Sequence, residues 1–140
     1  MKEDLNTKPA LARVLLIEDD ESTRESASIK LKKEGFLVES AEDGVIGLEK
    51  LKKDNQFSAI LLDIRMPKGD GFTFLEEKNK NSSLRAIPVL VFTNLGQSEY
   101  VERALALGAK GYIIKAHHSL QEIIAEMKTC IAGGVCTIDR

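Results

Sequence analysis

Short apolar runs alternate with helical patterns along almost the whole chain. The runs predict five short strands at residues 13–17, 36–40, 59–62, 87–92 and 111–114. The run at 59–62 is apolar throughout, as expected of a strand that is buried on both faces of a parallel sheet. The run at 36–40 is short and more polar, which favours a position at the edge of the sheet.

Capping residues and apolar spacing predict a helix after each strand. The expected helix starts include Asp20, about Asp43, Asp70 and Ser119. Glycines should end the first, fourth and fifth helices at Gly35, Gly108 and Gly133. The inward positions expected in the second and fourth helices are Val45, Leu48, Leu51, Val101, Ala104 and Leu105. The last helix has a capping box from Ser119 to Glu122 and an apolar face made of Leu120, Ile123, Ile124, Met127 and Ile131.

Five strands alternating with five helices predict an α/β fold: a doubly wound, five-stranded parallel sheet with right-handed crossovers and helices on both faces. The 140 residues suffice for one domain with a sizeable core. We expect a flexible N-terminal arm at residues 1–12, one folded domain at 13–132 and a C-terminal tail at 133–140.

Composition excludes several classes of function. The net charge of −2 gives no basic surface for nucleic acid and no polybasic membrane signal, and no leader or membrane span is evident, so we expect a cytoplasmic protein. Cys130 and Cys136 do not resemble a disulfide framework, so the expectation is helix packing for the first and a free thiol in the tail for the second. His117 and His118 lack partner ligands in the sequence and are expected to be exposed polar residues.

Polar side chains follow four of the five predicted strands. Glu18 and Asp19 follow the first strand, Asp63 the third, Thr93 the fourth and Lys115 the fifth. Because the carboxyl ends of parallel strands meet at one edge of a sheet, we expect these five side chains to converge there. That is hard to attribute to capping alone, so the sequence predicts a functional site.

The charges in this cluster indicate its chemistry. Three neighbouring carboxylates repel one another unless a cation intervenes, and hard oxygen ligands suit Mg²⁺. Lys115 and Thr93 could donate hydrogen bonds to phosphoryl oxygens. Asp63 could then be a nucleophile that forms an aspartyl-phosphate.

These residues also carry a family resemblance. The motifs are Glu18-Asp19, the stretch 62–67 with Asp70-Gly71, the stretch 91–93 and the stretch 108–115. Together, and in this order, they resemble the receiver domain of bacterial response regulators, in particular the stand-alone receivers of the chemotaxis-regulator type, over about residues 12–132. The resemblance implies a flavodoxin-like fold with strand order 2-1-3-4-5.

The resemblance also implies residue roles in a two-component phosphorelay. Asp63 would be the phosphoacceptor for a sensor histidine kinase or a phosphotransfer protein. Glu18, Asp19, Asp63 and the backbone carbonyl of Arg65 would hold Mg²⁺. Pairing Asp20 with Asp19 in place of Glu18 stays open, although a one-residue shift would spoil the match at Arg24.

Further roles follow for the fourth and fifth strands. Lys115 would pair with the carboxylate or the phosphoryl group, Thr93 would move toward the phosphate and Tyr112 would follow it as a switch. Receivers usually carry proline after this lysine, with a cis peptide, whereas this chain has Ala116. Because cis bonds to other residues cost about 2.5–4 kcal/mol, we expect either a trans bond with a rearranged loop or a strained cis bond. Leu95 is expected to shield the phosphoryl group and to slow its hydrolysis.

Output is expected through a downstream protein partner or a homodimer, using the face formed by the fourth helix, the fifth strand and the fifth helix. The domain would not be an enzyme beyond catalysing its own phosphorylation and dephosphorylation. Two alternatives are a phosphorylation-independent interaction module on the same fold and a flavin binder or enzyme of flavodoxin-like fold. The second would need a glycine- or hydroxyl-rich loop where this chain has the acidic residues 18–21. The chain could also be a fragment of a longer regulator.

Overall fold

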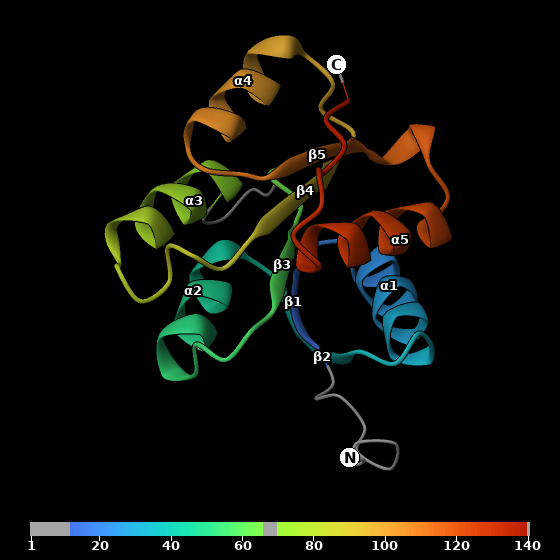
Figure 1. The fold of residues 1–140 in the computed structure, drawn as a ribbon, viewed down its shortest axis with the longest axis horizontal. Helices are drawn as coiled ribbons and strands as arrows, with labels where there is room; N and C mark the ends of the chain where they lie inside the picture. Colours follow the sequence, from blue (N-terminus) through green and yellow to red (C-terminus); the bar gives the residue numbers. More distant parts are fainter. Residues whose placement is uncertain (1–11, 66–69, 140) are drawn as a thin grey trace, which may run out of the picture.

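A computed structural model describes residues 12–65 and 70–139, which form one parallel sheet with helices on both faces (Figure 1). The strands lie in the order β2-β1-β3-β4-β5, as predicted, and every neighbouring pair is parallel. The expected N-terminal arm, apart from Ala12, lies outside the described residues. Within the described ranges, no helix is both long enough and apolar enough to cross a membrane.

The central strands are buried and the edge strand β2 is not. The strands are β1 (Arg13–Ile17), β2 (Leu37–Ala41), β3 (Ala59–Leu62), β4 (Val89–Thr93) and β5 (Gly111–Ile114). All residues of β3 and β4 are buried, whereas β2 has exposed and half-buried positions before Ala41. The polar character of the second run therefore reflects the predicted edge position.

Two helices cover one face of the sheet and three cover the other (Figure 1). The helices are α1 (Glu21–Lys33), α2 (Gly44–Lys53), α3 (Gly71–Lys80), α4 (Ser98–Ala106) and α5 (Leu120–Ile131). Residues of α1 and α5 pack into one apolar core, and residues of α2, α3 and α4 pack into the other. Asp20, Asp43, Asp70 and Ser119 cap α1, α2, α3 and α5 through their side chains, which satisfies backbone N–H groups at the helix starts.

One expected inward position in α2 is wrong. Val45 is 52% exposed, whereas Leu51 is fully buried. The buried face of the helix includes Gly44 and Gly47, and a Cβ atom on Gly47 would lie 2.5 Å from Ile17 Cδ1. The helix approaches β1 so closely that glycine occupies the inner face. The spacing of large apolar residues therefore indicated the wrong side of the first turn.

The chain reverses direction after α5. Gly133 has a φ of 86°, its N–H donates to Cys130 O, and the Gly134 N–H donates to Thr129 O. These two bonds form a Schellman motif, in which glycine adopts the left-handed conformation without a steric penalty. Residues 135–139, here called the C-terminal strap, then run beside β5 (Figure 1).

The two cysteines were wrongly expected to be unpaired. A disulfide joins Cys130 on α5 to Cys136 on the C-terminal strap, and their Cα atoms lie 5.3 Å apart. A spacing of 6 residues did not indicate a disulfide, because only the reversal at Gly133 and Gly134 brings the two residues together. The distance lies within the range that disulfides require.

Candidate functional site

The carboxyl ends of β1, β3, β4 and β5 bring together the side chains that the sequence predicted to converge. The Glu18 N–H donates to Ala41 O and the Asp63 N–H donates to Ile17 O, each at 3.0 Å. These bonds continue the sheet one residue beyond β1 and β3 and hold both residues at its edge. Glu18, Asp63 and Thr93 are buried, although each is polar.

Lys115 joins the two buried carboxylates. Its Nζ donates to Glu18 Oε1 at 2.5 Å and to Asp63 Oδ2 at 2.9 Å. The same Nζ lies 4.7 Å from the centroid of the Phe92 ring, which adds a cation–π contact. Lys115, the residue directly after β5, therefore places its ammonium group between the two buried carboxylates.

The electrostatics of the cluster are only partly balanced. Burial, reinforced by the charge of Asp63, raises the pKa of Glu18 even though Lys115 donates to it. Burial alone would lower the pKa of Lys115, but its hydrogen bond to Glu18 and the charge of Asp63 outweigh that effect and raise it. One ammonium therefore faces two buried carboxylates, and a further positive charge would be favourable.

Three carboxylates offer the ligand atoms for such a charge. Oxygen atoms of Glu18, Asp19 and Asp63 all lie within 4.8 Å of one another, and Asp19 is exposed to solvent. An all-oxygen donor set with an open side fits a hard divalent cation such as Mg²⁺, which keeps several of its water ligands. Asp20 lies outside this cluster and caps α1, with Oδ2 accepting the Thr23 N–H at 2.8 Å.

Arg24 fixes the acidic loop from the first turn of α1. Its Nη1 donates to the carbonyl oxygens of Glu18 at 2.8 Å and Asp19 at 3.2 Å. The side chain therefore holds the backbone of both acidic residues without neutralising their carboxylates. Sequence reasoning used Arg24 only as an alignment marker; a basic residue one turn into the helix after an acidic pair was the available signal.

The peptide bond between Lys115 and Ala116 is trans, the first of the two geometries that we expected. No peptide bond in the described segments is cis, and residues Lys115–His117 form a short 3₁₀ helix. The Ala116 N–H donates to Asn94 Oδ1 at 2.9 Å. Proline has no N–H to make this bond, so alanine allows an anchor that proline would not. Sequence reasoning missed Asn94, since nothing in the residues 91–94 marks it as a partner of the fifth strand.

Thr93 and Tyr112 are connected through Leu95. The Leu95 N–H donates to Thr93 Oγ1 at 3.4 Å, and the Tyr112 hydroxyl donates to the Leu95 carbonyl at 2.5 Å. Both Thr93 and Tyr112 are fully buried. Burial, then the nearby charge of Asp63, raises the pKa of Tyr112 to about 12, so its hydroxyl stays protonated.

An open groove of about 550 Å³ lies beside the acidic cluster. Its lining includes Asp19, Arg65 and Arg103. The Arg65 N–H donates to Asp63 Oδ1 at 3.0 Å, while its side chain is exposed. The guanidinium of Arg103 lies 4.2 Å from the centroid of the Phe72 ring. Two cationic side chains therefore line the groove together with Asp19. The neighbouring Pro67 of the predicted motif lies outside the described residues.

The chain resembles known proteins over most of its length. The family model "Response regulator receiver domain" matches residues 14–128. The chemotaxis protein CheY of Treponema pallidum is 40% identical over 108 residues, which cover 74% of this chain and 72% of that protein. The transcriptional regulator RpaA of Synechocystis is 32% identical over 121 residues, covering 86% of this chain and 49% of the regulator. The chain thus spans about half the length of RpaA and of the SilR protein of Salmonella typhimurium.

Solved structures agree with the observed architecture. The chemotaxis protein CheY4 of Vibrio cholerae has a TM-score of 0.79 and 30% identity, with 85% of this chain and 98% of that chain covered. A CheY-like receiver domain from Methanospirillum hungatei has a TM-score of 0.81 and 27% identity, with 89% and 96% covered. The resemblance drawn from the sequence is therefore confirmed. The chain belongs to the response regulator receiver domain family.

Proposed function

We propose that this protein is a phosphorylation switch in which Asp63 accepts a phosphoryl group from a sensor histidine kinase or a phosphotransfer protein. The observation that carries the proposal is the position of Asp63, buried at the mouth of β3 between Lys115 and the open Asp19 side. The receiver would comprise residues 13–132 and act in the cytoplasm.

The proposed reaction transfers a phosphoryl group from a nitrogen atom to an oxygen atom. A carboxylate oxygen of Asp63 forms a bond to phosphorus while the phosphorus–nitrogen bond of a phosphohistidine breaks, and the electron pair stays with the imidazole nitrogen. Asp63 Oδ2 is held by Lys115 and Oδ1 by the Arg65 N–H, so both oxygens have fixed positions before transfer. Such positioning, with electrostatic stabilisation, accounts for most catalysis of phosphoryl transfer.

Glu18, Asp19, Asp63 and the Arg65 carbonyl would hold the Mg²⁺ ion. When bound, the ion would neutralise charge on the phosphoryl oxygens. Lys115 already donates to Asp63 and would donate to a phosphoryl oxygen after transfer. Arg24 would keep the acidic loop in place, since it binds the loop carbonyls and not the carboxylates.

The signal would leave the site through Thr93 and Tyr112. The Thr93 hydroxyl is buried and accepts the Leu95 N–H, so a movement of this hydroxyl toward a phosphoryl group would break that bond. Leu95 contacts both residues, and such a shift would disturb the bond between its carbonyl and the Tyr112 hydroxyl. The changed face of α4, β5 and α5 would then bind a downstream protein or a second copy of the chain.

The experiment is intact-mass measurement after treatment with acetyl phosphate and Mg²⁺. We expect one phosphoryl adduct on the wild type and none on Asp63→Asn. The matched control is Asp43→Asn, which makes the same change from a carboxylate to an amide. It leaves a competent helix cap, because asparagine caps as well as aspartate. An adduct that survives in Asp63→Asn would refute the assignment. A wild type without any adduct would favour the phosphorylation-independent interaction module.

A further inference from the structure

The C-terminal strap occupies the outer edge of β5. The Tyr112 N–H donates to Thr137 O at 3.0 Å, and the Asp139 N–H donates to Tyr112 O at 2.8 Å. These bonds form a parallel bridge between Tyr112 and Ile138. The Ile114 N–H donates to the Asp139 carboxylate at 2.9 Å. The strap therefore satisfies backbone groups that an edge strand otherwise exposes.

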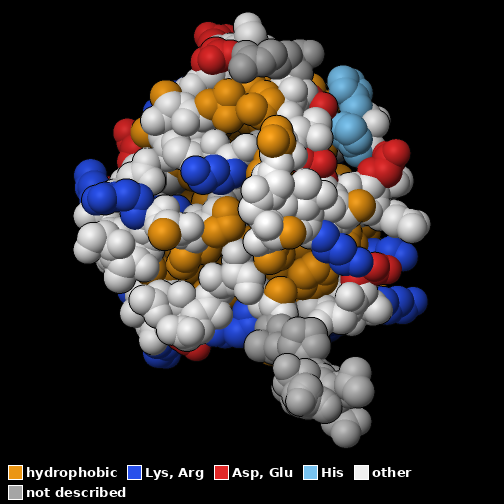
Figure 2. Space-filling model, in the orientation of Figure 1, with side chains coloured by type: hydrophobic (Ala, Val, Ile, Leu, Met, Phe, Trp, Pro, Cys, Tyr) orange, Lys and Arg blue, Asp and Glu red, His pale blue; other side chains and the backbone are white. Residues whose placement is uncertain are grey.

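Side chains hold the strap at its middle and at its end. At its middle, the Thr137 hydroxyl donates to Glu126 Oε1 at 2.9 Å, and the Thr137 N–H also donates to this carboxylate. At its end, Asp139 Oδ2 lies 2.8 Å from His118 Nε2. The two histidines form a surface patch beside acidic side chains (Figure 2). His118 was expected to be a plain exposed residue, yet it is half-buried against the strap.

β5 is shaped to receive the strap. A Cβ atom on Gly111 would lie 2.9 Å from Cys136 Cβ and 3.1 Å from Thr137 O, distances that are too short for ordinary contact. Gly111 therefore allows the strap to lie directly against the start of the strand. The Schellman motif at Gly133 and Gly134 supplies the required reversal.

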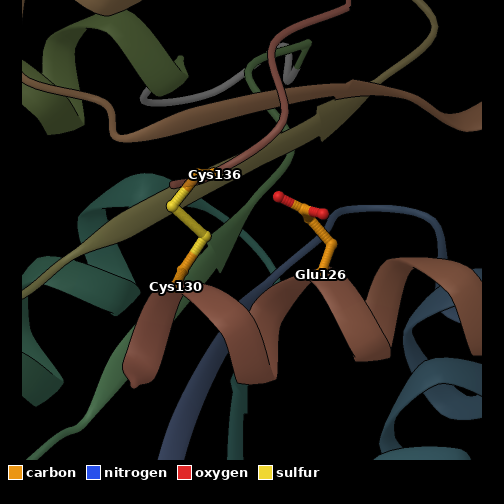
Figure 3. A group of neighbouring side chains, drawn as sticks. All are labelled: Glu126, Cys130 and Cys136. Carbon is orange, nitrogen blue, oxygen red and sulfur yellow. A yellow bond between two sulfur atoms is a disulfide. The ribbon is translucent and has the colours of Figure 1, made fainter. Parts of the chain in front are cut away.

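The disulfide is the covalent fastening of this segment (Figure 3). Cys130 is 8% exposed on the inner side of α5, and Cys136 is half-buried on the strap. Noncovalent contacts hold the strap through a few backbone bonds and two partly exposed side-chain pairs. A covalent tether beside them keeps the strap at a high effective concentration near β5.

We propose that Cys130 and Cys136 form a reversible redox site, and that their disulfide fastens the C-terminal strap to β5 and to the backbone of Tyr112. In the oxidised protein, the strap covers the outer edge of β5. In the reduced protein, the strap detaches and this edge becomes exposed to solvent. This regulation is separate from phosphorylation. If the proposed function holds, the redox site controls access to the backbone of the switch residue.

The reaction is thiol–disulfide exchange with a small-molecule disulfide such as oxidised glutathione. The more accessible Cys136 attacks as a thiolate, releases one small thiol and forms a mixed disulfide. Cys130 then displaces the second small thiol and closes the protein disulfide. The protein loses two electrons and two protons, and the small disulfide becomes two thiols.

The test compares oxidised protein, reduced protein and Cys136→Ser by amide hydrogen exchange. Intact mass and thiol labelling establish each redox state. We expect the amides of Tyr112, Ile114 and Asp139 to exchange at least about tenfold faster in the reduced protein and in Cys136→Ser than in the oxidised protein. Amides of the central strand β3 serve as the internal control and should keep their protection. Cys136→Ser changes a half-buried position, so the variant should fold.

Three results would overturn the proposal. The first is equal protection of these amides in all three samples. The second is failure of oxidised glutathione to form the bond in the folded protein. The third is a reduced protein that keeps the strap protected by retaining Zn²⁺, because Glu126, Cys130 and Cys136 lie close enough to form a metal clamp instead (Figure 3). The readout needs no phosphoryl group, so Asp63→Asn should behave like the wild type, and failure here leaves Asp63 phosphorylation untouched.

Discussion

The ammonium of Lys115 donates to Asp63 Oδ2 at 2.9 Å, although the residue after the lysine is alanine and its peptide bond is trans. The 3₁₀ turn at Lys115–His117 redirects the chain, and Asn94 anchors that turn through the Ala116 N–H. A proline is therefore not required to bring this lysine to the acidic cluster. The side chain of Asn94, directly after β4, holds the turn that positions the lysine.

Lys115→Met should destabilise the protein by about 2–4 kcal/mol at neutral pH in the presence of a chelator. The substitution leaves Glu18 and Asp63 buried next to each other without their shared cation. Urea unfolding measures the loss, and added Mg²⁺ should recover part of it, because a ligand that binds only the folded state stabilises that state. Lys33→Met, at an exposed site in the last turn of α1, is the control. Equal losses in the two variants would contradict this account of the cluster.

Asn94→Ala should cost about 1 kcal/mol of unfolding free energy, the usual contribution of one hydrogen bond. It should also slow formation of the acetyl phosphate adduct, because the turn that presents Lys115 loses its anchor. The matched variant is Gln97→Ala, an exposed residue that starts α4 without a side-chain capping bond. If Gln97→Ala slows the reaction as much as Asn94→Ala, the anchor is not the cause.

Lys78 should make stability increase with pH in the alkaline range. Lys78 is 2% exposed, and its Nζ donates to Arg85 O at 3.0 Å. Burial, with a smaller contribution from the charge of Lys110, lowers the pKa of Lys78 to about 8. Between that value and about 10.5, the unfolded chain binds a proton that the folded chain does not, so raising the pH favours folding.

We therefore expect the wild type to gain about 1–2 kcal/mol relative to Lys78→Met between about pH 7.5 and 9.5. Denaturant unfolding at both pH values measures the difference. Lys80→Met, on the exposed side of the same helix, should keep the wild-type dependence. A pH-independent difference between wild type and Lys78→Met would show that Lys78 stays charged in the fold.

Leu95→Glu should shorten the lifetime of the phosphorylated state severalfold. Leu95 is half-buried, packs against the core below the site and lies between Thr93 and Tyr112, so an acidic side chain there could orient a water molecule. Loss of the intact-mass adduct over time, after removal of acetyl phosphate, gives the rate. Leu95→Met keeps the apolar character and should decay like the wild type. An unchanged rate in Leu95→Glu would mean that Leu95 does not shield the phosphoryl group.

The sequence predicted the parts of this molecule that depend on local pattern and on strand ends. β3 is an unbroken apolar run, the caps at Asp20 and Ser119 have recognisable residues, and parallel topology places Glu18 and Lys115 at the same edge of the sheet. These features follow from period, capping chemistry and sheet geometry.

The features it missed depend on contacts between distant segments. Asn94 matters only because the turn after β5 comes within hydrogen-bonding distance of it. Cys136 reaches Cys130 because two glycines reverse the chain, and spacing along the sequence does not encode that reversal. Val45 was misplaced for a related reason, because the close approach of α2 to β1 depends on the absence of a side chain at Gly47.

The reversal after α5 also changes the direction in which the polypeptide leaves the domain. Cys136 lies beside Gly111, at the amino end of β5, and Asp139 lies beside Ile114, at its carboxyl end. A segment attached directly to the end of α5 would emerge on the edge opposite Asp63. A segment attached after Asp139 would instead start at the same end of the sheet as Asp63, so any module joined there would lie near the entrance that the proposed phosphodonor would use.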